Sequence, residues 1–166
     1  MEYHDAKEKF LSLWGTLSDS WGISKTMGQV HALLLISPQS MSTEEVMNRL
    51  SISRGNAHLN LKALMDWGLI YCEMKPGDRK DFYYAEKDTW EIFRKIVIQR
   101  KKKELDPVVK LFDEIASVKE DCEESKEFCK MVSELRLMSN QADSMLDKIL
   151  KTDPNWLTKG MLAMLK

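Results

Sequence analysis

The chain has little of what several protein classes depend on. Its three cysteines, Cys72, Cys122 and Cys129, are odd in number and lack the spacing of metal ligands, which argues against a disulfide framework and favours a reducing interior. No run approaches the roughly 18 apolar residues that a membrane span needs. The first ten residues carry acidic side chains and no apolar run, unlike a signal peptide. We therefore expect a cytoplasmic protein without a membrane span.

Marks of catalysis are also missing. The sequence has no phosphate-cradling glycine loop, nucleophile elbow or paired-carboxylate motif. Its three histidines, His4, His31 and His58, fall in different predicted elements. We predict that the protein is not an enzyme and has no catalytic residue, cofactor or metal site. The net charge of −1 gives no global positive field to attract nucleic acid, although a local basic patch would be enough.

What the chain does contain is apolar residues at steps of three and four, which predict a mainly α-helical protein. Ser42 and Glu45 have the spacing of a capping box, and Ser53 is suited to cap the helix that follows. Gly22 and Gly68 are expected to end helices. The predicted helices span residues 5–21, 25–36, 43–50, 54–67, about 90–103, 107–118 and 121–150, with a last short one from 154 that holds Trp156, Leu157, Met161 and Leu165.

A β-hairpin is predicted after the fourth helix. The stretch "LIYCEMKPGDRKDFYYAE" reads as two short strands around a Pro-Gly-Asp turn. Three helices followed by a two-stranded hairpin are typical of a winged helix-turn-helix. We expect an N-terminal helix at 1–22 that contributes to a dimer, a winged helix-turn-helix domain at 23–87 and a helical dimerisation region at 88–166.

The helix at 54–67 is predicted to have one apolar and one polar face. Ala57, Leu61 and Leu64 fall on the apolar side. The polar side is predicted to carry Arg54, Asn56, His58 and Asn60 and to face outward. In a helix-turn-helix the second helix enters the major groove, where Arg can contact guanine and Asn adenine. Gly55 would allow the backbone to approach a phosphate closely, and Lys62, two turns later, suits a phosphate contact. The alternative is a merely solvated helix face.

The hairpin tip is basic. A wing commonly meets phosphates or the minor groove, while the alternative is that charged turns protect a sheet edge. The candidate DNA-binding residues are Ser53, Arg54, Gly55, Asn56, His58, Asn60, Lys62, Lys75, Arg79 and Lys80.

The segments "LSISRGNAHLNLKALMDWGLI", "PGDRKDFYYAEKDTWEIFRKI" and "RKKKELDPV" resemble the GbsR branch of the MarR-type transcriptional regulators. The resemblance runs along most of the chain and is weakest over the last forty or so residues. It implies a homodimeric prokaryotic repressor whose winged domains are joined by N- and C-terminal helices. It would assign Ser53, Arg54, Asn56, His58 and Asn60 to the recognition helix, and Arg79 and Lys80 to the wing.

The outer helices, 5–21 and 107–165, supply more apolar surface than a small winged domain could cover, which favours a homodimer. The alternative is that they bury this surface within one subunit. The helix at 121–150 carries a repeat typical of a coiled-coil seam. Its members are Phe128, Val132, Leu135, Met138, Ala142, Met145 and Ile149.

A candidate ligand pocket is suggested by four aromatic residues. Trp14, Trp21, Trp90 and Phe93 could form a cage for a quaternary ammonium effector, but tryptophans at helical spacing more often form plain core. Taken together, the sequence predicts a dimeric, sequence-specific regulator that binds double-stranded DNA and acts as a repressor. The alternative is a winged helix used only for protein contacts.

Overall fold

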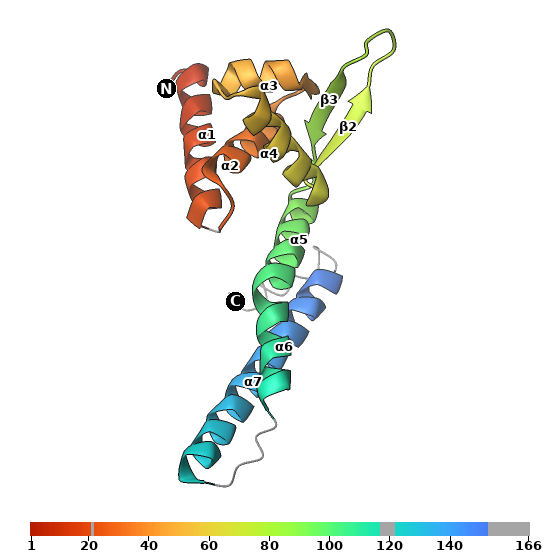
Figure 1. The fold of residues 1–166 in the computed structure, drawn as a ribbon. Coiled ribbons are helices and arrows are strands. Elements are labelled where there is room, and N and C mark those ends of the chain that lie inside the picture. The colour runs from red at the N-terminus through yellow and green to blue at the C-terminus, as the bar shows by residue number, and fades with distance from the viewer. Residues whose placement is uncertain (21, 117–121, 153–166) are drawn as a thin grey trace, which may run out of the picture. The chain divides into compact units, whose positions relative to one another are not determined.

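The computed structural model describes residues 1–20, 22–116 and 122–152, and these residues form a mainly helical protein with one small sheet (Figure 1). The chain divides into a first unit, Met1–Lys95, and a second unit, Ile96–Lys166. The elements are α1 Tyr3–Ser20, α2 Lys25–Ile36, β1 Met41–Ser42, α3 Thr43–Leu50, α4 Arg54–Asp66, β2 Ile70–Met74, β3 Asp81–Ala85, α5 Thr89–Arg100, the π-helical turn η1 Lys101–Leu105, α6 Asp106–Ile115 and α7 Glu123–Lys151.

Helix α2 is the centre of the first unit. Val30, Ala32 and Leu33 are fully buried, and α2 packs against both α1 and α4. A helix that is apolar nearly all round belongs in a core, which is why α2 lacks the polar face of its neighbours. The predicted inward positions Met27, Val30, Leu33 and Leu34 are confirmed as buried.

Trp14 of α1 makes a buried polar contact with α2. Its indole N–H donates a hydrogen bond of 3.2 Å to Nδ1 of His31, whose side chain is almost fully buried. Because Nδ1 accepts this bond, the neutral ring carries its proton on Nε2, which has no hydrogen-bond partner among the described residues. Burial, with a smaller contribution from the charge of Lys87, lowers the pKa of His31 to about 4.

This buried imidazole predicts an acid-sensitive core. The unfolded chain binds a proton at His31 near the ordinary pKa of 6.5, whereas the folded chain does not until about 4. The free energy of unfolding is therefore not reduced by His31 above about pH 6.5, and protonation of His31 in the unfolded chain lowers it as the pH falls toward 4. Urea unfolding at about pH 5 should give a free energy of unfolding about 2 kcal/mol below that at about pH 7.5.

The matched variants are His31→Gln and His58→Gln, the second on an exposed histidine. The His31 contribution to the pH dependence should vanish in His31→Gln and persist in His58→Gln. An unchanged pH dependence in His31→Gln would assign the acid sensitivity to other groups.

The predicted caps of α3 and α4 and the predicted glycines after α1 and α4 are confirmed. Ser42 accepts from the backbone N–H of Glu45, and the Glu45 carboxylate accepts from the Ser42 N–H at 2.7 Å, which completes the capping box before α3. The hydroxyl of Ser53 accepts from the N–H of Asn56 at the start of α4. Gly22 and Gly68 follow α1 and α4 and both adopt positive φ. Each signal is local, so it can be read from the sequence.

The sheet has three antiparallel strands in the order β1-β3-β2, so the expectation of a two-stranded wing was incomplete. Strands β2 and β3 form the predicted hairpin, with Cys72 opposite Tyr83. The additional strand pairs Met41 with Tyr83 and Ser42 with Phe82. A two-residue strand is too short to show the alternation by which strands are predicted, and it places the start of α3 against the hairpin.

In the second unit α6 starts at Asp106 with Pro107 in its first positions, close to the predicted start, but Asp106 does not cap it, because α5 continues through η1 into α6 without a break. Leu105 and Asp106 keep right-handed helical dihedrals, and the N–H of Asp106 bonds to the carbonyl of Lys101 in a widened turn. Pro107 lacks an N–H and its ring crowds the preceding turn. A π-turn at this point accommodates the proline within the helix.

Charged pairs hold η1 and α6 to α7. Lys101 Nζ lies 2.8 Å from Asp143 and 3.4 Å from both Asp106 and Asp147. The hydrogen bond to Asp143 is the largest cause that raises the pKa of Lys101. Arg136 of α7 pairs with Asp113 of α6 at 2.6 Å. The expected last helix, from 154, lies outside the described residues, and none of the helices that are described is long and apolar enough to cross a membrane.

Candidate nucleic-acid interface

Helix α4 has the two faces that the sequence predicts. Ala57, Leu61 and Leu64 are buried against the first unit, while Arg54, Gly55, Asn56, His58 and Lys62 are exposed. The hydroxyl of Ser53 is occupied as an acceptor by the cap, which fixes the N-terminal turn of the helix. The exposed side chains therefore project from a helix that is packed along its opposite side.

Asn60 is the exception, and its expected outward position is wrong. The side chain is only 9% exposed. Its Nδ2 donates to the carbonyl oxygen of Asn56 at 2.8 Å, and its Oδ1 accepts a 3.2 Å bond from the hydroxyl of Ser24, the cap of α2. Residue 60 shares a helix face with Ala57, Leu61 and Leu64, so helical spacing could have revealed this. Asn60 positions α4 on α2 instead of contacting a partner.

The three wing cations differ in their surroundings. Lys75 is half-buried, with Nζ 4.0 Å from the centre of the Phe82 ring, an arrangement that stabilises the turn end of the hairpin. Arg79 is exposed at the tip, and no ion pair holds it within the part of the chain that the structure describes. Lys80 pairs with Glu44 of α3 at 2.7 Å.

Glu44 links the two parts of the candidate interface. Its carboxylate lies 2.7 Å from Lys80 of the wing and 3.7 Å from Arg54 of α4. The hydrogen bond from Lys80 lowers the pKa of Glu44, and the same bond raises the pKa of Lys80. A hollow of about 150 Å³ is lined by these residues. All three side chains are at least half exposed, so the pairs are weak and both cations can exchange Glu44 for another anion at small cost.

Sequence reasoning missed Leu59. It is 70% exposed on α4, between His58 and Lys62 on the side that faces away from the core. An exposed leucine on an otherwise polar face suits contact with an apolar group such as the methyl of thymine. The signal was present in the spacing, because residue 59 lies one turn from both 55 and 62 and off the buried face.

The described candidate cage residues lie in two separate groups of rings, one around Trp14 and one formed by Trp90 and Phe93. The Trp14 ring is 5.5 Å from that of Phe10 and 6.0 Å from that of His31. Trp90 stacks near Phe93 at 5.3 Å on α5. Among the described residues no ring contact joins the group around Trp14 to Trp90 and Phe93. Trp21 lies outside the described residues, so the cage as a whole stays a prediction.

Comparisons with known proteins give a fold likeness only. No protein-family model and no curated protein sequence matches the chain. The crystal structure of a transcriptional regulator superposes with a TM-score of 0.66 at 17% identity, over 87% of this chain and 95% of that one. Less similar are NadR in complex with 4-hydroxyphenylacetate, with a TM-score of 0.42 at 13% identity over 90% and 89% of the chains, and MarR, with 0.40 at 16% identity over 82% and 94%.

The first of these superpositions agrees with the element order described above, in which a capped helix, a short turn, a second helix and an antiparallel hairpin follow one another. The chain therefore has a mainly helical winged-helix fold, shared over most of its length with a known transcriptional regulator.

Proposed function

We propose that the protein is a homodimeric transcription regulator that binds specific sequences of double-stranded DNA, a repressor of the GbsR-type branch of the MarR-like regulators, acting in a prokaryotic cytoplasm. One observation carries the proposal. The exposed face of α4 is cationic and polar at its N-terminal turns, and Glu44 connects its Arg54 to Lys80 of the wing. Groups that read bases and groups that bind phosphate thus occupy one continuous surface.

The residues divide into two roles. Arg54 and Asn56 lie in the first turn of α4, the part of a recognition helix that meets base edges, and Leu59 adds an apolar contact. Lys62 and Arg79 are exposed cations that lie outside the first turn of α4, and we assign them to contacts with DNA phosphates. On DNA, Arg54 and Lys80 would exchange the Glu44 carboxylate for DNA groups.

The dimer is supported by an apolar stripe on α7 that remains exposed among the residues the structure describes. Within the second unit Val132 is buried, whereas other members of the predicted seam remain exposed. The exposed apolar residues of this stripe are Phe128, Met131, Leu135, Met138 and Met145. From Phe128 to Met138 they recur at steps of three and four, and Met145 follows one heptad later, as a seam between helices requires. We assign the dimer contacts to the second unit together with α1, and the DNA contacts to the winged part of the first unit.

The test is selection of bound sequences from a random duplex pool by the whole protein. The wild type should enrich an inverted repeat whose half-site centres lie about one helical turn apart. No enrichment, with weak binding to every duplex, would favour a winged helix used for protein contacts.

Substitutions in α4 should alter this selection position by position. Arg54→Ala should relax one guanine position by roughly tenfold to a hundredfold, and Leu59→Ala should relax one thymine position by less. Asp66→Ala, at the far end of the same exposed side, is the matched control and should leave the preference unchanged. Unchanged preference in Arg54→Ala would remove this residue from base readout.

A further inference from the structure

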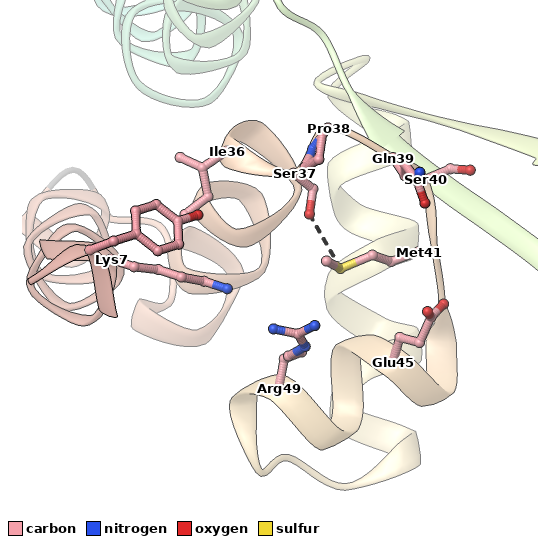
Figure 2. Close-up of a pocket in the computed structure, with 10 residues that line it drawn as sticks. Lys7, Ile36, Ser37, Pro38, Gln39, Ser40, Met41, Glu45 and Arg49 are labelled. Atoms are coloured by element: carbon pink, nitrogen blue, oxygen red, sulfur yellow. Dashed lines mark hydrogen bonds between the residues drawn. The ribbon is translucent and has the colours of Figure 1, made fainter. Parts of the chain in front are cut away.

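A pocket of about 290 Å³ lies in the first unit, away from the exposed face of α4 and from the wing tip. Its walls come from the start of α1, the end of α2 with the loop that follows, β1 and α3 (Figure 2). The lining residues are Tyr3, Lys7, Ile36, Ser37, Pro38, Gln39, Ser40, Met41, Glu45 and Arg49. A volume near 300 Å³ is at the lower end of the range found for small-molecule sites.

Two cations from different helices share this pocket. In Figure 2 the ammonium group of Lys7 and the guanidinium group of Arg49 point into the same space between α1 and α3. Lys7 is half-buried. Neither side chain has a hydrogen bond or ion pair among the residues whose contacts are described. Two like charges directed into one hollow disfavour each other unless an anion lies between them.

Glu45 is the one carboxylate in the lining, and it is already in use. Its Oε2 accepts from the backbone N–H of Ser42 at 2.7 Å and from the Ser42 hydroxyl at 2.9 Å. These bonds lower the pKa of Glu45 and hold it at the N-terminus of α3. The carboxylate therefore serves the capping box, and its charge also attracts Arg49. No hydrogen bond or ion pair among the described residues joins it to Lys7 or Arg49, so both cations keep their donors for an anion.

The rest of the lining is partly apolar. Ile36, Pro38 and Met41 contribute apolar atoms to the lining, and Ser37 has its hydroxyl directed at the sulfur of Met41. A fully hydrated inorganic anion gains little from such a surface, whereas the hydrocarbon part of an organic acid can be buried on it. Arg49 supplies a planar fork of donors that matches a carboxylate.

We infer that this pocket binds a small organic carboxylate, with its charged end between Lys7 and Arg49 and its apolar body against Ile36, Pro38 and Met41. Such a ligand connects α1 to α3, the helix that precedes α4. The inference goes beyond the proposed function, and its test uses no DNA, so either can fail while the other holds.

The experiment is titration of the whole ¹⁵N-labelled protein, followed by backbone amide shifts. The probes are benzoate, hexanoate and succinate, with benzamide as the neutral analogue and inorganic phosphate as the anion without an apolar body. At least one carboxylate should give saturable shifts at the amides of residues 36, 37, 39–41 and 49 below about 10 mM. Its binding should be at least about tenfold tighter than that of benzamide and phosphate. Lys7→Gln and Arg49→Gln should each weaken the binding of that carboxylate about tenfold. Lys9→Gln, on α1 like Lys7 but outside the pocket lining, should leave the binding unchanged.

Two results would overturn the inference. One is the absence of saturable shifts at these positions with all three carboxylates. The other is binding that Lys7→Gln and Arg49→Gln leave unchanged, or that phosphate matches in affinity, since the pocket would then not recognise an organic acid through these two cations. Thermal unfolding of each variant verifies that the fold is retained, as expected for side chains at the pocket rim.

Discussion

Replacing both cations at the end of the wing, in the double variant Arg79→Ala/Lys80→Ala, is expected to weaken operator binding by about three orders of magnitude at about 0.1 M salt. Each phosphate contact contributes about 0.9 to the slope of log K against log salt, which at this concentration is close to tenfold in affinity. A dimer would lose four such contacts. The sequence preference should stay the same, because these side chains are assigned to phosphate and not to bases.

The fold should survive this change. Arg79 is exposed without an ion pair within the described residues, and Lys80 pairs only with the exposed Glu44. Exposed pairs of this kind contribute about 0–1 kcal/mol. The matched control is Lys110→Ala/Lys130→Ala, which removes the same charge from exposed positions of the second unit. Affinity equal to that of the control, measured by fluorescence anisotropy on one duplex, would show that the wing does not touch DNA.

The second large effect concerns the contact between α1 and α2. A Cβ added to Gly28 would lie 2.6 Å from the Cβ of Ser18 and 3.1 Å from the Cα of Gly15. The second neighbour is backbone and cannot rotate away. Gly28→Ala should therefore force α1 from α2 and lower the free energy of unfolding by about 3 kcal/mol, even though alanine is the better helix former.

Gly55→Ala is the matched control, because a Cβ at Gly55 meets nothing within 4 Å. This variant should be more stable than the wild type by about 0.5–1 kcal/mol, since it removes backbone freedom from the unfolded chain. It should nevertheless bind DNA more weakly, because the added methyl lies on the exposed face of α4 where a phosphate is proposed to approach. Urea unfolding measures both variants, and equal stabilities would contradict the close α1–α2 contact.

Features that depend on a few neighbouring residues could be predicted from the sequence. The capping box of Ser42 and Glu45, the cap at Ser53 and the glycine at 68 each involve residues within one helical turn. The amphipathic pattern of α4 was likewise sufficient to separate Ala57, Leu61 and Leu64 from Arg54 and the other exposed residues. Local hydrogen bonding and spacing decide such features.

Features that depend on distant partners were missed. Asn60 looks like a surface residue by type, but its acceptor meets Ser24, 36 residues earlier in the chain. Strand β1 exists because Met41 and Ser42 pair with β3, about 40 residues later. Pro107 reads as a helix start by rule, yet the preceding π-turn lets the helix continue. For Asn60 helical spacing already indicates the buried face, and tertiary context supplies the partner. For β1 and Pro107 the structural context decides between two locally acceptable structures.

The candidate site shows the same division. Arg54 and Lys80 could be predicted from the sequence as candidate DNA-binding residues. The role of Glu44 as their common partner could not, because it depends on how α3, α4 and the wing meet. The pocket between Lys7 and Arg49 is also invisible in the sequence, because its two charged residues are 42 positions apart.

The most direct measurement is the affinity of the wild-type protein for its selected duplex as a function of salt. Groove entry by two copies of α4, with both wings on the backbone, brings about six or more phosphate contacts. The logarithm of the association constant should then fall with log salt at a slope of about −5 or steeper. A slope near zero, or binding no tighter than to a random duplex, would contradict the assignment of α4 and the wing to DNA.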